Sequence, residues 1–478
     1  MYSKIQMIDY SKYFRFKLKS QQIRAFLAIV DFIESDQRVF ILNGYAGTGK
    51  TTLMSGLINW LNQKRTDVVL LASTGRASKI LSNKTQNKSS TVHSHIYRFQ
   101  ELSADLEKMS ESKSDNGQIR LVFDLKTLNS TTETIYIVDE SSMISDAHEQ
   151  KGSFAKFGSG DLLSDLLSFD AMGKYIFVGD PCQLPPIEQS DSPALSKDYI
   201  FSKFLLSAAE FELTDIIRQS DDSGIIKASF ELRELFRINP DQRWAKLPLR
   251  GFENVNFHDS HVSLIGSYLK EVRDNGFDSA TLICQTNSHC HDINTVIRSA
   301  LGRENHLSVG DLLMVTQNNH LSSLVNGDHV IVKAILHREK RCGLTFVWVE
   351  VQEQFSKIKQ SSFLIEDILY TKDTNLTTEQ HRELMMDFFL RMKAKNIYQG
   401  DEQFNDEMLT DPYLNAIKSV FGYALTCHKC QGGEWDNVYL YLDNKIQGLP
   451  RPQIYQWWYT AVTRTKKNLH VVDDWFIS

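Results

Sequence analysis

The sequence predicts an α/β fold built on parallel sheets, and three observations indicate it. Short, continuously apolar runs alternate with helix-like stretches in the early part of the chain, as strands buried on both faces of a sheet do. Each run is followed by a polar or glycine-rich turn. A second α/β region appears later, around 280–285 and again at 439–443. The early runs lie at 39–42, 68–72, 135–138 and 175–178.

Composition excludes several classes of protein. The 478 residues, 42% of them hydrophobic and 23% charged, suit roughly three globular domains. No apolar run approaches the ~18 residues of a membrane helix, the N-terminus carries no readable secretory signal, and six cysteines are too few for a disulfide scaffold. We therefore expect a cytoplasmic protein without membrane contact. The net charge of −6 argues against coating nucleic acid by bulk charge, but it permits a local basic groove.

A phosphate-binding loop follows the first apolar run. Residues 44–51, GYAGTGKT, match G-x-x-x-x-G-K-[ST] in full between a predicted strand and a predicted helix. In such loops backbone N–H groups cradle phosphates, the lysine reaches the β- and γ-phosphates, and the last hydroxyl binds magnesium. The residues expected to bind the nucleotide here are Gly44, Gly47, Thr48, Gly49, Lys50, Thr51 and Thr52.

An acidic pair ends another apolar run and completes the predicted metal site. Asp139 is placed to hold magnesium together with Thr51, and Glu140 to polarise the attacking water as a general base. The combination predicts a P-loop NTPase. The Asn-Lys pairs at 83–84 and 444–445 lack the aspartate of a guanine-reading element, which argues against a GTPase.

Two segments interrupt the α/β pattern. The polar stretch 105–117, with an Asn116-Gly117 turn before a strand-like 119–123, indicates a small insertion at 94–134. Runs at 330–335 and 344–351 are typical of antiparallel strands. A helix with a capping box at Thr377 and Gln380 follows them, so 330–415 is predicted to be a small β-barrel with a helical arm.

Further motifs stand in a fixed order along the chain. They are Leu18, Gln22 and Ala25, then STGRA at 73–77, TVH at 91–93, DESSM at 139–143, GDPCQLPP at 179–186, LTDIIRQ at 213–219, YALTCHKCQGGE at 423–434 and YTAVTR at 459–464. With the phosphate loop, this series resembles the Dda/RecD-type branch of superfamily 1 DNA helicases between residues 18 and 467.

The resemblance implies two RecA-like motor domains, each with a parallel sheet, and two inserted modules. The implied ranges are 1–93 with 135–205 for the first motor domain and its ATP site, 94–134 for a pin subdomain, 206–329 with 416–478 for the second motor domain, and 330–415 for the inserted barrel and arm. The residue of the pin that separates the strands is not readable, although Phe99 and Phe123 are candidates.

The resemblance also implies roles around ATP. Gln22 would read the adenine edge, Gln183 would sense the γ-phosphate, and Glu434 would accept from the ribose hydroxyls. Arg218 and Arg464 would reach the γ-phosphate from the second motor domain, which makes hydrolysis depend on closure of the cleft. Lys50, Glu140, Gln183, Arg218 and Arg464 form the expected catalytic set.

By the same resemblance, a second set of residues would contact the backbone of single-stranded DNA. The expected partners include junctions between single-stranded and double-stranded DNA. The expected DNA-binding residues are Thr74, Arg76, Thr91 and His93 in the first motor domain and Thr426, His428 and Lys429 in the second. We interpret Trp435, Trp457 and Trp458 as core residues rather than stacking platforms. RNA as the track stays open, because backbone and stacking contacts discriminate poorly.

Cys427 and Cys430 have the spacing of a zinc half-site, but they fall inside a helicase motif and no nearby pair completes four ligands, so no zinc is expected. The prediction is therefore an ATP- and magnesium-dependent DNA helicase, monomeric and moving 5′ to 3′ by the resemblance. Two alternatives stay open. One is the helicase subunit of a larger recombination nuclease-helicase complex, and the other is a DNA-binding ATPase module that does not unwind. Replication or recombination proteins are candidate partners.

Overall fold

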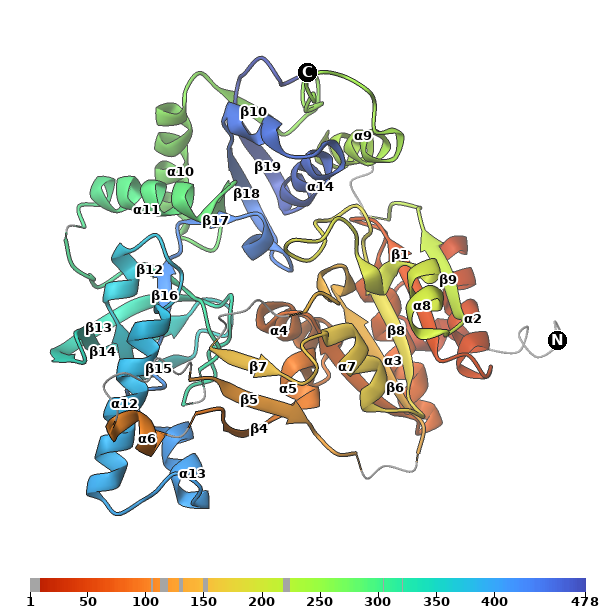
Figure 1. Cartoon of the computed structure of the whole chain (residues 1–478). Helices are drawn as coiled ribbons and strands as arrows, with labels where there is room; N and C mark the ends of the chain where they lie inside the picture. The colour runs from red at the N-terminus through yellow and green to blue at the C-terminus, as the bar shows by residue number, and fades with distance from the viewer. Residues whose placement is uncertain are drawn as a thin grey trace.

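A computed structural model describes residues 9–104, 106–111, 119–128, 132–148, 154–217, 224–303, 305–319 and 321–478. Four sheets organise these residues, and Figure 1 shows them as separate bodies around the middle of the molecule. Two of the sheets are entirely parallel and carry the motifs expected to bind the nucleotide. No helix in the described ranges is long and apolar enough to cross a bilayer.

The first sheet has six parallel strands in the order β3-β2-β6-β8-β1-β9. Helices cover both faces, because the central strands are apolar on both sides and bury two separate clusters of side chains. The four predicted runs lie in β1, β2, β6 and β8 and are confirmed. The strands are β1 (Val39–Gly44), β2 (Asp67–Ala72), β3 (Ser89–Thr91), β6 (Thr134–Asp139), β8 (Lys174–Gly179) and β9 (Ala208–Leu213). The helices are α2 (Ser20–Ile33), α3 (Lys50–Lys64), α4 (Gly75–Thr85), α5 (Val92–Ile96), α7 (Leu162–Phe169) and α8 (Lys197–Phe204).

The second sheet has five parallel strands in the order β10-β19-β18-β11-β17. The predicted runs at 280–285 and 439–443 fall on β11 and β18. The strands are β10 (Val255–His258), β11 (Ala280–Cys284), β17 (Ala424–Thr426), β18 (Trp435–Tyr441) and β19 (Thr465–Val472). The helices are α9 (Gly224–Ile238), α10 (His261–Asn275), α11 (Asn287–Ala300) and α14 (Arg451–Val462). Trp435, Trp457 and Trp458 are all buried, as predicted for core residues.

The third sheet is antiparallel, in the order β15-β14-β13-β12-β16. Backbone hydrogen bonds of Ile417 to Phe363 and Ile365 bring its two edges together, so the sheet curls as a small barrel does. It extends on both sides of the predicted module 330–415, because the short apolar runs of β12 and β16 also pair with it. The strands are β12 (Leu312–Val315), β13 (His329–Arg341), β14 (Leu344–Glu353), β15 (Lys359–Ile365) and β16 (Ser419–Phe421).

A fourth sheet of three strands, β4-β5-β7, lies beside the first sheet. Two of its strands come from the predicted insertion 94–134, whereas the third comes from a later segment and pairs in parallel with β5. The Asn116-Gly117 turn lies outside the described residues. The strands are β4 (Tyr97–Leu102), β5 (Leu121–Leu125) and β7 (Ala155–Phe157).

The predicted helical arm consists of α12 (Thr378–Ala394) and α13 (Glu402–Thr410). Its capping box is confirmed, since the Thr377 hydroxyl accepts from the N–H of Gln380 and the Gln380 side chain accepts from the N–H of Thr377. The buried face of α12 packs against the short helix α6 (Leu106–Glu111) and β4. The arm therefore joins the three-stranded sheet, although more than 200 residues separate them in the chain.

Candidate active site in the cleft between the parallel sheets

The phosphate loop lies between β1 and α3, as its motif predicts. Gly47 and Gly49 have φ angles of 80° and 81°, which a residue with a Cβ rarely adopts. A Cβ at Gly49 would also lie 2.6 Å from Nε2 of Gln22. The Lys50 ammonium lies over the loop and donates to the carbonyls of Gly44 and Tyr45. The Lys50 side chain therefore folds back onto its own loop.

A cavity of about 970 Å³ opens from this loop and is lined from both parallel sheets. The first sheet and its helices contribute the predicted residues Gln22, Gly47, Gly49, Lys50, Thr51, Thr52, Asp139, Glu140 and Gln183. The second contributes Glu434 and Arg464. Gly44 and Thr48 do not line the cavity. The Thr48 hydroxyl is fully buried and donates to the carbonyl of Tyr45, so its side chain shapes the loop instead.

The acidic pair stands at the end of β6. Burial raises the pKa of Asp139 to about 7, the adjacent Glu140 adds to the rise, and Lys50 opposes it. Glu140 itself has a left-handed backbone, with φ of 52°, where the chain turns out of the strand. A carboxylate and the Thr51 hydroxyl lining one cavity offer the oxygen ligands that magnesium prefers. The residues present therefore fit that ion.

Gln183 lies in the loop after β8 and is 4% exposed. Its Oε1 is buried and has no hydrogen-bond partner in the described part of the chain. A buried carboxamide oxygen without a partner costs free energy that a bound group or water can recover. Gln183 is one of the residues that line the nucleotide cavity, as a residue that senses the terminal phosphate or its water should be.

Arg464 follows α14 and reaches the same cavity from the second sheet. Its guanidinium is 5% exposed and donates to the carbonyls of Thr460 and Gly433 and to the hydroxyl of Thr463. Burial by itself lowers the pKa of Arg464, but the charges of Glu140 and Glu434, among others, raise it above its usual value. The arginine therefore stays charged where the two sheets meet. Arg218 lies outside the described residues.

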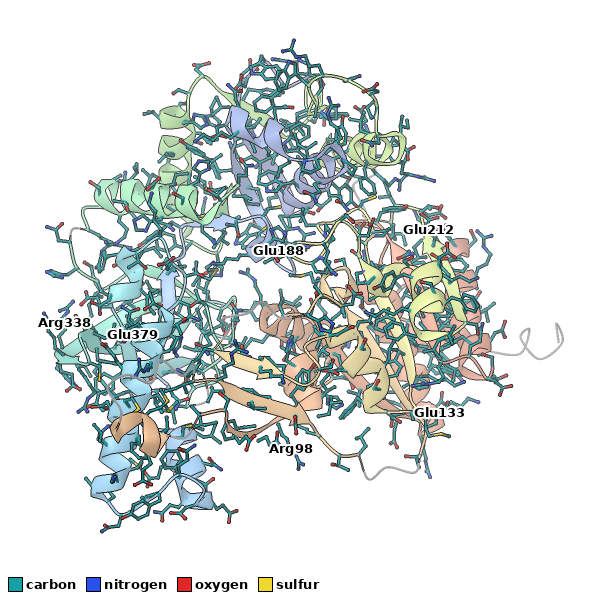
Figure 2. All side chains as sticks on the ribbon, viewed as in Figure 1. Arg98, Glu133, Glu188, Glu212, Arg338 and Glu379 are labelled. Carbon is teal, nitrogen blue, oxygen red and sulfur yellow. The ribbon has the colours of Figure 1, made fainter. Side chains whose placement is uncertain are left out.

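The sequence did not point to Gln21, which organises the segment before Arg218. Its Oε1 accepts from the backbone N–H groups of Thr214 and Asp215, at 2.9 and 2.7 Å, and its Nε2 donates to the Thr214 hydroxyl. Next to them the N–H of Ile217 donates to the carbonyl of Gly47 in the phosphate loop. The sequence gives no sign of this role for Gln21, because its hydrogen-bond partners lie nearly two hundred residues away in the chain. At the same edge Glu212, labelled in Figure 2, accepts from the Tyr45 hydroxyl.

The predicted DNA-binding residues of the first sheet have local partners. Thr74 and Thr91 cap α4 and α5, accepting from the N–H groups of Ala77 and Ser94. His93 packs against two aromatic rings, and burial lowers its pKa to about 4, so its imidazole is neutral.

Arg76 lies at the contact between the sheets. Its guanidinium covers the Trp435 ring at 4.6 Å, and its Nη1 lies 2.7 Å from Nδ1 of His329. Nearby, Lys79 forms a salt bridge of 2.5 Å with Asp328. The helix α4 of the first sheet is thereby fastened to the loop before β13.

The counterparts on the second sheet follow β17. Thr426 and Lys429 line a small pocket beside α11, and burial lowers the pKa of Lys429. His428 begins a short 3₁₀ turn, and burial lowers its pKa as well. The two predicted sets thus lie at the carboxyl ends of strands in two different sheets. Their role in binding DNA stays a prediction.

The cysteines of the same segment, Cys427 and Cys430, are buried and are not joined in a disulfide. Cys430 Sγ lies 2.9 Å from the carbonyl of Cys427, and both side chains are fully buried. Within the described ranges, no three His, Cys, Asp or Glu side chains gather in a way that could hold a metal ion.

Two parts of the chain match known protein families. Residues 17–235 match the family described as AAA domain, and residues 421–472 match the UvrD-like helicase C-terminal domain. The class is thus a P-loop ATPase with a helicase-type second domain, in agreement with the shared cavity.

Individual relatives narrow the family. The chain is 23% identical to the ATP-dependent DNA helicase dda of Enterobacteria phage T4, over 89% of this chain and 92% of that protein. It is 21% identical to the RecBCD enzyme subunit RecD of Buchnera aphidicola, over 95% of this chain and 73% of that protein. A crystal structure of Pif1 helicase from Bacteroides, in complex with ADP-AlF3 and single-stranded DNA, matches the fold with a TM-score of 0.51 at 16% identity, over 97% of this chain and 94% of that one. Together these matches indicate a superfamily 1 helicase of the Dda/RecD/Pif1-like kind.

Proposed function

We infer that this protein is an ATP-dependent DNA helicase that moves along single-stranded DNA from 5′ to 3′. The observation that carries the inference is the shared cavity. The phosphate loop and the acidic pair enter it from one parallel sheet, and Arg464 and Glu434 enter it from the other. A nucleotide held there touches both sheets, so binding and hydrolysis change how the sheets sit against each other. The polarity follows from the family.

The residues divide the work of hydrolysis among themselves. Lys50 and the loop N–H groups would hold the phosphates, and Thr51 with Asp139 would hold magnesium, which neutralises charge on the transferring group when bound. Glu140 would orient and deprotonate the attacking water, and Gln183 would accept from that water through Oε1 or donate to the γ-phosphate through Nε2. Arg464 would stabilise the charge that spreads over the phosphoryl oxygens.

We propose that the DNA strand runs between the two predicted sets of backbone contacts. Phosphate contacts of this kind position a strand without reading its sequence, as a translocating enzyme requires. The three-stranded sheet and the arm would then meet the junction of single and double strands. Because the strand path and the junction contact are both built from residues of this one chain, we propose that the isolated chain unwinds DNA as a monomer.

One observation favours a second possibility. The RecD relative is, by its name, a subunit of a larger enzyme, and this chain matches nearly three quarters of it. The alternative is that the chain unwinds DNA only within a complex. Strand separation by the purified chain decides between the two.

The test is ATP hydrolysis with and without single-stranded DNA, in the wild type and two variants. We expect strong stimulation by DNA in the wild type. Lys50→Ala should lose turnover because a phosphate contact disappears, while Arg464→Ala should keep ATP affinity and lose about 10³-fold or more in rate, because its contact strengthens in the transition state. Normal turnover in Lys50→Ala, or lost nucleotide binding with an unchanged turnover number in Arg464→Ala, would contradict the assignment.

A further inference from the structure

Tyr459 joins the two parallel sheets at the phosphate loop. It lies on α14, which packs on the second sheet, and its side chain is 1% exposed. The N–H of Ala46, inside the phosphate loop, donates to the Tyr459 oxygen at 3.0 Å. The same hydroxyl donates to Oδ2 of Asp180 at 2.7 Å, in the loop after β8. One phenol from the second sheet therefore holds two loops of the first.

The neighbours of Tyr459 strengthen the same contact. The Thr460 hydroxyl accepts from the N–H of Leu184 at 2.9 Å, and Gln456 donates to the carbonyl of Gln183 at 3.3 Å. From α9, the guanidinium of Arg233 lies over the ring of Tyr45 at 4.3 Å. The backbone beside the γ-phosphate sensor is thus held by side chains of α14. The phosphate loop itself is contacted through Tyr45 and Ala46.

The electrostatic setting keeps the bridge intact. Burial raises the pKa of Tyr459 well above its usual value, and the Asp180 charge raises it further, so the phenol keeps its proton and can donate. Asp180 is 1% exposed, and its Oδ1 accepts from the N–H of Cys182 at 3.0 Å. Removing the hydroxyl would leave the Ala46 N–H and a buried carboxylate oxygen of Asp180 each short of one partner.

We propose that Tyr459 is a positioning residue for hydrolysis. Its hydroxyl fixes the position of the phosphate loop relative to the Gln183 loop when the two sheets close on the nucleotide. The proposal rests on the proposed function and adds a residue to it. Tyr459 acts through Ala46 and Asp180 and does not touch the reacting atoms. Its loss should therefore lower the rate of the DNA-stimulated reaction while ATP affinity is kept.

The experiment compares Tyr459→Phe with Tyr455→Phe in the full chain. Tyr455 is a matched control, because it is equally buried on the same helix and its hydroxyl interacts with Arg451 of that helix. With saturating single-stranded DNA, Tyr459→Phe should lose about tenfold in kcat with KM for ATP nearly unchanged, as expected when one buried hydrogen-bond bridge is lost. Tyr455→Phe should keep the wild-type kcat. Thermal unfolding of both variants shows that the fold is kept.

A double-mutant cycle with Asp180→Asn distinguishes positioning from a general loss of packing. If Asp180 acts through Tyr459, the double variant should lose no more kcat than the more affected single variant. Fully additive losses, or a Tyr459→Phe enzyme with wild-type kcat, would overturn the proposal while leaving the helicase assignment intact. If Tyr459→Phe does not fold, Asp180→Asn carries the test, and wild-type kcat in that variant overturns the proposal. A wild-type chain that hydrolyses no ATP with DNA would overturn both.

Discussion

The surroundings of Gln183 and Arg464 determine which of their polar groups are available to a bound nucleotide. Gln183 presents a buried oxygen with no partner in the described residues, and Arg464 is fixed by carbonyls that leave its charge facing the cleft. Both were predicted from motifs, since a motif records residue type and spacing. The capping of helices by Thr74 and Thr91 was not predicted, because it depends on where a helix begins. The bridge formed by Tyr459 was also missed, since its partners belong to another sheet.

His381 provides a test at this scale. It lies on α12, is 6% exposed, and stacks on Phe154 with ring centroids 4.1 Å apart. Burial, with a contribution from the charge of Lys418, lowers its pKa to about 3, so the folded protein holds it neutral. Below about pH 6.5 the unfolded chain takes up a proton that the folded chain refuses, and stability falls as the pH falls.

From pH 7 to pH 5 this single group should cost about 2 kcal/mol of the free energy of unfolding. His381→Phe keeps an aromatic ring against Phe154 and removes the titration. The difference in free energy of unfolding between pH 7 and pH 5, measured by urea denaturation, should therefore be smaller in the variant by about this amount. An equal difference in both proteins would show that His381 is not held neutral.

At the scale of elements, the arm and the three-stranded sheet form one unit. Met385, Phe388 and Met392 of α12 are buried together with Leu102 of β4 and Leu106 of α6, and Lys393 lies 3.1 Å from Glu107 of α6. The sequence predicted the arm helix and its capping box, because both are local patterns. It did not predict what the arm contacts, since the hydrophobic stripe of a helix indicates burial without naming the partner.

Phe388→Ala should uncouple unwinding from hydrolysis. Phe388 is fully buried in the cluster that the arm shares with β4 and α6, and truncating such a ring costs about 3–5 kcal/mol of local stability. The arm would no longer support the three-stranded sheet, so we expect DNA-stimulated ATP hydrolysis to persist while strand separation falls strongly. Leu390→Ala on the same helix is the control, because Leu390 is 56% exposed. Unwinding that survives Phe388→Ala unchanged would mean that the sheet needs no support from the arm.

At the scale of the whole molecule, contacts between distant segments decide how the parts sit together. The α/β class, the strands of both parallel sheets and the barrel strands followed from apolar runs and turn signals, which are local. The extension of the barrel to β12 and β16 could not be predicted in this way, because strands of three or four residues are too short to show a clear sequence pattern. The salt bridge between Lys79 of α4 and Asp328 was not predicted either, because these two residues are about 250 positions apart in the chain. Domain boundaries inside the chain stay predictions.

The central claim is that ATP turnover in the shared cleft drives this chain along DNA in one direction. The most direct measurement is ATP-dependent strand separation by the purified chain on two duplexes, one with a 5′ single-stranded tail and one with a 3′ tail. The account predicts that only the 5′-tailed duplex opens, and that Lys50→Ala opens neither. Opening of the 3′-tailed duplex alone would contradict the polarity, and failure on both duplexes despite DNA-stimulated hydrolysis would contradict the claim that the chain unwinds by itself.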